Sequence, residues 1–295
     1  MVDAEGPSAP RPGEGESVTV GTNGIELHAV AAGPEDGPLA VLLHGFPEFW
    51  YGWHAQIRPL AEAGYRVVVP DQRGYNFSDK PSGIDAYRIG ELADDVTGLI
   101  DALGRESAHV VGHDWGAGVA WWTALHAPER VRTLTAVNVP HPTVMYRTLG
   151  RSWRQRLRSW YMLAFQVPRA PEAVVRATNY RPFARGMRRS SLPGTFAAED
   201  LDRYRAAWGR EGALTGMINW YRAAARRRPE PRRREVDPPT LIVWGADDRF
   251  LLRSMAHDSA DYCRDARVAM LEGATHWVQH ELPRRVAELL CDQFE

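Results

Sequence analysis

Short apolar runs separated by turn-forming residues predict a series of buried strands. In other stretches, apolar residues recur every three or four positions, which is the spacing of a helix. Strands that alternate with helices are typical of an α/β fold, a largely parallel sheet with helices on both faces. The predicted strands cover residues 17–20, 25–30, 39–43, 66–70, 108–112, 131–139, 240–244 and 267–271, and the helices residues 53–63, 89–103, 115–126 and the C-terminal stretch.

The pattern changes at Pro140. From there to about residue 235 the chain has no clear strand-like run and is rich in arginine, tryptophan and tyrosine at mostly helical spacing. We expect residues 140–235 to form a helical insertion in a core made of residues 17–139 and 236–295. Open α/β sheets bind ligands at the carboxyl ends of their strands, so the insertion is expected to lie over that edge as a lid. Residues 1–16 are predicted to be a disordered, solvated tail.

The composition is that of an ordinary globular protein and excludes a disordered chain or a fibre. The 295 residues are 44% hydrophobic and 25% charged, with a net charge of −1 at pH 7. No apolar run is long enough to span a membrane, and the N-terminus has no signal-peptide pattern, so a cytoplasmic protein with no membrane partner is expected. The near-zero net charge predicts no general attraction to nucleic acid. The arginine-rich run at 226–234 is interrupted by Pro229 and Pro231, which also disfavours nucleic-acid binding.

The sharpest motif is Gly112-His113-Asp114-Trp115-Gly116, placed directly after a predicted strand and before a predicted helix. A tight turn between strand and helix exposes its central side chain above the sheet, as in a nucleophile elbow. Here that side chain is the carboxylate of Asp114, which is ionised at pH 7 and can displace a leaving group at an sp³ carbon to form an ester. Water must then hydrolyse this ester, and that step needs a base.

The remaining members of a triad follow in the order nucleophile, acid, base. His276 follows the last predicted strand and is the candidate base. Asp247 and Asp248 follow the strand at 240–244, and spacing alone does not decide which of them orients His276. An oxyanion hole needs backbone N–H donors near the nucleophile, and those of Phe46 and Trp115 are the candidates.

Three segments together resemble the epoxide hydrolases of the α/β-hydrolase fold. These are His44-Gly45-Phe46-Pro47-Glu48, then residues 71–81 (DQRGYNFSDKP), then Gly112-His113-Asp114-Trp115-Gly116. The resemblance extends from about residue 17 to the C-terminus. It implies an α/β-hydrolase core with a mostly parallel eight-stranded sheet and a helical cap.

The resemblance also implies roles for single residues. Asp114 is the expected nucleophile, His276 the base and Asp248 its partner, since the W-G-x-x-D pattern ends at Asp248. Tyr161 and Tyr221, from the cap, are expected to hydrogen-bond the epoxide oxygen. Two further expectations concern positioning: Glu48 places the hydrolytic water, unless it is a surface carboxylate, and Trp115 helps to place the substrate or the water.

No metal-ligand cluster or phosphate-binding glycine loop is found, so neither a metal nor a cofactor is expected. The expected partners are a small apolar epoxide and water, and the protein is expected to be a monomer or a homodimer. Haloalkane-type dehalogenases, which share the aspartate nucleophile, are the main alternative. Phe46 stands where haloalkane dehalogenases usually have Asn or a second Trp. Trp115 and Ser159 stand where the fluoroacetate dehalogenases, which share the His-Gly-Phe-Pro motif, have Arg and His. A non-catalytic ligand receptor on the same fold is the second alternative, although it would have no need of a triad.

Overall fold

A computed structural model of the chain describes residues 5–226, 230–231 and 233–295. Its centre is an eight-stranded sheet in the order β1-β2-β4-β3-β5-β6-β7-β8. β2 is antiparallel to both of its neighbours, β1 and β4. The other six strands, in the order β4-β3-β5-β6-β7-β8, run parallel to one another, which confirms the mostly parallel sheet. The strands are β1 (Glu16–Thr22), β2 (Ile25–Ala32), β3 (Leu39–Leu43), β4 (Arg66–Pro70), β5 (Ala108–His113), β6 (Val131–Val137), β7 (Thr240–Gly245) and β8 (Ala266–Leu271).

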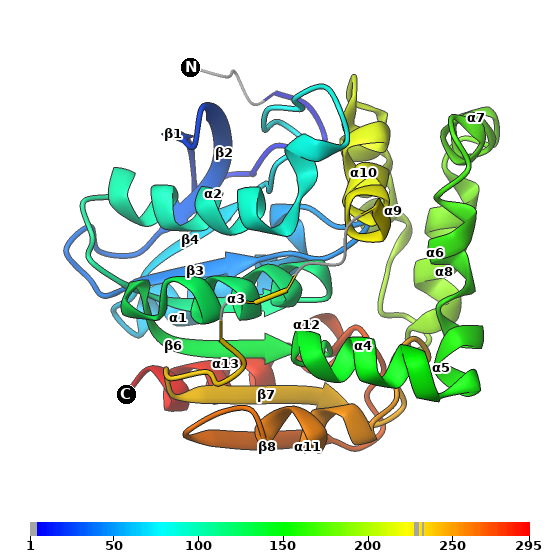
Figure 1. The fold of residues 1–295 in the computed structure, drawn as a ribbon. Coiled ribbons are helices and arrows are strands. Elements are labelled where there is room, and N and C mark those ends of the chain that lie inside the picture. Colours follow the sequence, from blue (N-terminus) through cyan, green and yellow to red (C-terminus); the bar gives the residue numbers. More distant parts are fainter. Residues whose placement is uncertain (1–4, 227–229, 232) are drawn as a thin grey trace.

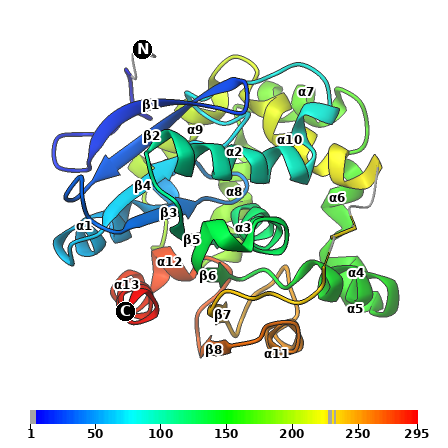
Figure 2. The ribbon, with the colours of Figure 1, turned by 60° about the vertical axis from the view of Figure 1, so that its left-hand side comes forward.

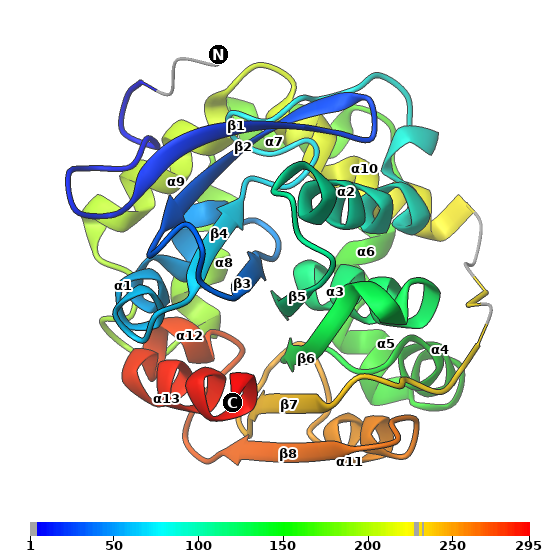
Figure 3. The ribbon, with the colours of Figure 1, turned by 90° about the vertical axis from the view of Figure 1, so that its left-hand side faces the viewer.

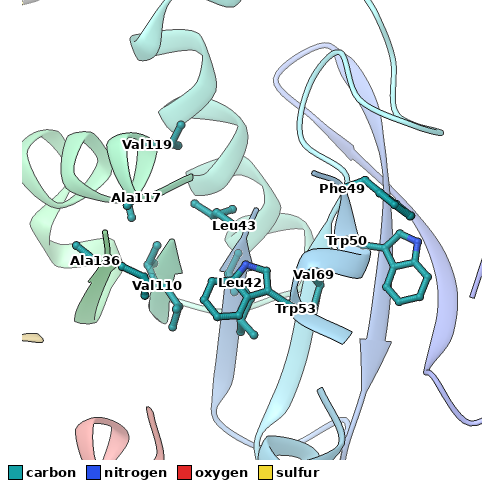
Figure 4. Packing of buried hydrophobic residues seen from close by; sticks show 14 of the residues in the cluster. Leu42, Leu43, Phe49, Trp50, Trp53, Val69, Val110, Ala117, Val119 and Ala136 are labelled. Carbon is teal, nitrogen blue, oxygen red and sulfur yellow. The ribbon is translucent and has the colours of Figure 1, made fainter. Parts of the chain in front are cut away.

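Helices cover both faces of the sheet, as can be seen in Figure 3, which looks roughly along the strands. α2 (Ile89–Ala102), α3 (Trp115–His126) and α11 (Ser254–Ala260) lie on one face, and α1 (His54–Glu62) and α13 (Pro283–Phe294) on the other. The central strands β3 and β5 are buried along their whole length, which explains their uninterrupted apolar runs. In Figure 4, side chains of β3, β5 and β6 pack with Ala117 and Val119 of α3 in the main core.

Among the residues that the structure describes, seven helices lie between β6 and β7 in the sequence. In Figure 1, α5 to α8 stand beyond the ends towards which β6 and β7 point, and α9 and α10 stand beside α2. The bounds are α4 (Pro142–Arg151), α5 (Trp153–Arg158), α6 (Trp160–Ala164), α7 (Ala170–Ala177), α8 (Arg181–Ser190), α9 (Ala198–Gly209) and α10 (Ala213–Arg226). Residues 227–229 and 232, within the arginine-rich run, lie outside the described residues.

Short helices complete the connections: η1 (Trp50–Trp53), η2 (Asp85–Tyr87), η3 (Pro128–Arg130) and α12 (Val278–Glu281). One predicted strand is shorter than expected, because β6 ends at Val137 instead of residue 139. Asn138 has a φ of 53°, which takes the chain out of the extended conformation. This turn aims the Asn138 side chain at the site described below.

Part of the N-terminal segment packs against the rest of the chain, while residues 5–7 and 11–13 are exposed. Ser8 is fully buried, and its carbonyl accepts a hydrogen bond of 3.0 Å from the indole of Trp50. Glu14 forms an ion pair of 2.7 Å with Arg203 of α9. Residues 5–15 therefore connect the sheet side of the molecule to the inserted helices, because their polar groups find buried partners there.

The described residues contain no helix that is long and apolar enough to cross a bilayer. The same residues include no group of three His, Cys, Asp or Glu side chains placed to hold a metal ion. Both cysteines, Cys263 and Cys291, are free thiols.

Candidate active site

The elbow has the predicted strand–turn–helix structure. Asp114 lies between β5 and α3 with a φ of 50°, in the left-handed region that a non-glycine residue rarely adopts. The flanking glycines make the turn possible. A Cβ at Gly112 would collide with the carbonyl of Gly116, and one at Gly116 with the carbonyl of Leu43. The strained turn thus holds the Asp114 carboxylate at the carboxyl edge of the sheet.

His276 lies between two carboxylates. Its Nδ1 is 2.8 Å from Oδ2 of Asp248, and its Nε2 is 3.5 Å from Oδ2 of Asp114. Asp248 is buried and Asp247 is exposed, so the geometry distinguishes the two aspartates that spacing alone could not separate. Since Nδ1 faces Asp248, the other ring nitrogen is directed at Asp114.

Three further donors fix the Asp248 carboxylate. Asn138 donates to Oδ2 at 2.6 Å, while the N–H groups of Phe250 and Leu251 donate to Oδ1 at 2.6 and 3.0 Å. Burial opposes ionisation of Asp248, but the nearby His276 and these donors outweigh it and lower the pKa of the carboxyl. Asp248 is therefore an ionised, immobile partner for the His276 ring.

The two carboxylates also control the protonation of His276. Burial favours the neutral ring, but Asp248 and Asp114 together outweigh it and raise the pKa of His276 to about 10. At neutral pH the protein therefore holds a cationic His276 between these two carboxylates. Any reaction that removes the charge of Asp114 takes away part of this effect and lowers the pKa of His276.

This dependence gives a first testable prediction. Asp114→Asn is expected to lower the pKa of His276 from about 10, because one of its two anionic neighbours becomes neutral. The measurement is an NMR titration of the His276 ring, with the intact mass confirming that the amide is still present. Asp247→Asn, at an exposed carboxylate, is the matched control and is expected to leave the titration unchanged. An unchanged His276 pKa in Asp114→Asn would contradict the electrostatic coupling.

One predicted oxyanion donor contacts the carboxylate of Asp114, the predicted nucleophile. The backbone N–H of Phe46 donates to Oδ1 of Asp114 at 2.8 Å. Trp115 is the first residue of α3, where backbone N–H groups have no partner within the helix. A Cβ at Gly45 would press against the Asp114 side chain, so this loop needs glycine to approach the elbow.

A cavity of about 900 Å³ opens over Asp114. Trp115, Tyr161, Tyr221 and Phe250 line it, so residues from the sheet edge and from the inserted helices share its wall. The Tyr221 ring packs edge-on against Trp115 and Tyr161, with centroid separations of 5.1 and 5.9 Å. Burial raises the pKa of both tyrosines well above the usual value, so their hydroxyls stay protonated and can donate hydrogen bonds.

Glu48 lies in a buried polar cluster behind the elbow. Its Oε1 contacts Tyr204 at 2.8 Å and His280 at 2.7 Å, and its Oε2 contacts His113 at 2.9 Å and Gln279 at 3.1 Å. Glu48 is 1% exposed, so it is no surface carboxylate. These four neighbours occupy the acceptor positions of a carboxylate, which leaves none for a water. In this cluster Glu48 contacts other side chains, which differs from the water-placing role that the sequence led us to expect for it.

Comparisons with known proteins agree with this geometry. Residues 38–283 match the family model described as the alpha/beta hydrolase fold. The AB hydrolase superfamily protein YfhM of Bacillus subtilis is 48% identical over 273 residues, covering 92% of this chain and 96% of that protein. Epoxide hydrolase A of Mycobacterium tuberculosis is 34% identical, covering 92% of this chain and 95% of that protein. Among solved structures, the Bacillus megaterium epoxide hydrolase in complex with an inhibitor is 31% identical, with a TM-score of 0.85 over 94% of this chain and 99% of that chain.

The chain belongs to the epoxide hydrolases of the α/β-hydrolase family. In this epoxide hydrolase, the structure brings together all five predicted catalytic residues: Asp114, His276, Asp248, Tyr161 and Tyr221.

Sequence reasoning missed several polar residues of this epoxide hydrolase that support the site. Asn138 bridges Oδ2 of Asp248 and the backbone N–H of Gly245. His113 contacts the carbonyl oxygen of His276 at 2.8 Å, and so connects Glu48 to the segment that carries the base. The position of Asn138 at the end of a predicted strand was an available signal. No comparable signal marked Tyr204, Gln279 or His280.

Proposed function

We propose that the protein hydrolyses an apolar epoxide to a vicinal diol through a covalent ester on Asp114. The observation that carries the proposal is the position of the Asp114 carboxylate at the floor of the cavity. His276 Nε2 lies 3.5 Å from one of its oxygens, and two protonated tyrosines line the same cavity. We further propose that helices α4–α10 act as the cap that supplies these tyrosines.

In the first step, an oxygen of Asp114 attacks an epoxide carbon. A carbon–oxygen bond forms to Asp114 as the ring carbon–oxygen bond breaks, and the ring oxygen becomes an alkoxide. Tyr161 and Tyr221 would hydrogen-bond this oxygen, and one of them would give it a proton. Their raised pKa keeps that proton available until the alkoxide forms.

In the second step, water attacks the ester carbonyl of Asp114. Esterification removes the negative charge of Asp114, which lowers the pKa of His276. One N–H proton of the His276 ring would then pass to the tyrosinate, and the neutral His276 would accept a proton from water. Asp248 would stabilise the imidazolium that forms. The N–H groups of Phe46 and Trp115 would hold the oxyanion until the ester bond breaks. The departing alkoxide would then take the proton of the new Asp114 carboxylic acid, which releases the diol and restores the carboxylate.

The two tyrosines should be partly redundant, because either hydroxyl can meet the alkoxide. Tyr161→Phe and Tyr221→Phe are each expected to lower kcat by about 10- to 100-fold, and the double variant by about 10⁴-fold. Steady-state kinetics with one epoxide give the comparison, and Tyr146→Phe, at another tyrosine that lines the cavity, is the matched control. A double variant that retains near-normal kcat would exclude the tyrosines as proton donors.

For Glu48, we propose a positioning role in place of direct contact with water. Through His113 it would hold the backbone of His276 and thus the distance from His276 to Asp114. The cluster is buried and lies behind the elbow, so this role is indirect.

The experiment that tests the proposed function measures diol formation from a panel of aryl and alkyl epoxides, with halide release from haloalkanes measured in parallel. The expected result is diol without halide release, since the hydroxyls of Tyr161 and Tyr221 in the cavity wall can donate to an alkoxide. Halide release without diol would identify a dehalogenase. Tight binding of epoxides that are never converted would indicate a receptor.

A further inference from the structure

An exposed apolar surface follows the outer side of the inserted helices. Within the described residues, every large hydrophobic side chain that is mostly exposed lies between residues 153 and 192. Trp153 and Trp160 are each 65% exposed and Leu163 is 76% exposed. In Figures 1 and 2, the helices α5, α6 and α7 that carry most of these residues lie at one margin of the molecule, away from β1. We call this surface the outer face; its members are Trp153, Leu157, Trp160, Leu163, Val167 and Val174.

The outer face is surrounded by positive charge. Residues 141–196 contain eleven arginines and a single acidic residue, Glu172. That carboxylate is buried in an ion pair of 2.6 Å with Arg222, so it does not offset the surface charge. Arg151, Arg154 and Arg176 are exposed and form no ion pair with any described residue. The overall charge of −1 thus conceals a strongly cationic region.

The combination of charge and side-chain type selects one kind of partner. A second copy of the chain, docked by a two-fold axis through this face, would bring two cationic surfaces together. Nucleic acid would match the charge, but it has no aliphatic surface for Leu157, Leu163 and Val167. Anionic lipid matches both features, because arginines meet the headgroups while tryptophan and leucine enter the acyl boundary. We propose that the outer face docks on the surface of an anionic bilayer.

Docking of this kind would place the mouth of the cavity at the lipid surface. Leu163 belongs to the outer face and also lines the cavity over Asp114. Met162 and Ser159, from the same segment, line it as well. An apolar epoxide dissolved in the bilayer could then reach Asp114 without crossing bulk water. This last step rests on the proposed function, whereas the docking itself does not.

The test is flotation of the purified protein with vesicles of phosphatidylcholine alone or with about one third phosphatidylglycerol. Binding is expected only to the anionic vesicles and is expected to weaken in high salt. Trp153→Ser with Trp160→Ser is expected to reduce the bound fraction at least tenfold, and Arg151→Gln with Arg154→Gln to reduce it severalfold. Neither pair lines the cavity, so turnover of a water-soluble epoxide should not change. The matched control is Arg284→Gln with Arg285→Gln on α13, which removes two exposed arginines elsewhere.

Three outcomes would overturn the docking proposal. One is equal flotation with neutral and anionic vesicles. Another is a dimer that forms in gel filtration and dissociates in the double tryptophan variant, which would assign the face to a second copy. The third is binding to single-stranded or duplex DNA with no binding to vesicles. Because flotation needs no substrate, a failure of the proposed epoxide chemistry would leave this result unaffected.

Discussion

Asp114→Ala is expected to abolish diol formation, with kcat reduced by about 10⁴-fold or more. The substitution removes the carboxylate that the elbow presents to the cavity. A water molecule in its place would not be ionised at neutral pH, whereas a carboxylate is, so it would be a far weaker nucleophile. The measurement is diol production by chromatography at substrate concentrations well above KM.

The control for this variant must separate loss of chemistry from loss of fold. Circular dichroism and binding of the diol product are expected to stay near wild type, because Asp114→Ala removes atoms that face the cavity. Asp247→Ala, at an exposed aspartate of the neighbouring loop, is expected to keep full turnover. Near-normal turnover by Asp114→Ala would exclude the covalent mechanism.

His276→Gln is expected to stop the reaction halfway, because ring opening does not need the base and ester hydrolysis does. After exposure to an epoxide, the intact mass of this variant should rise by the mass of one substrate molecule. Peptide mapping should place the adduct on Asp114. The adduct should persist for hours, whereas the wild-type enzyme should show none at steady state.

A matched histidine strengthens this experiment. His257 is exposed on α11 and contacts neither carboxylate of the triad, so His257→Gln should turn over normally and carry no adduct. An unmodified mass for His276→Gln, with epoxide still consumed to diol, would show that His276 is not the base of the second step.

Much of the fold could be predicted from the sequence because the apolar pattern follows directly from burial. Residues 66–70 form β4 with the predicted bounds because they are a continuous buried apolar run. Residues 115–126 form α3 with the predicted bounds because the helix begins directly after the elbow. The end of β6 could not be predicted in this way. The apolar residues Val137 and Val139 flank Asn138 and favour a continued strand, but Asn138 leaves the extended conformation and its side chain reaches Asp248.

The N-terminal segment shows the same limit. Its composition of proline, glycine and glutamate is typical of a solvated tail, yet Glu14 pairs with Arg203, almost 190 positions later. Partners so distant in sequence leave no local pattern. The contacts of Glu48 are of the same kind, because Tyr204, Gln279 and His280 reach it from other parts of the chain. The triad was easier to find because each member follows a recognisable strand.

The most direct test of the covalent mechanism is a single turnover of the wild-type enzyme in water labelled with ¹⁸O, with enzyme in excess over epoxide. In the proposed mechanism water attacks the ester carbonyl, so the new hydroxyl oxygen of the diol comes from Asp114. The mechanism therefore predicts unlabelled diol and one ¹⁸O atom in the peptide that contains Asp114. Labelled diol with an unlabelled Asp114 peptide would mean that water opens the epoxide directly, and would contradict the mechanism.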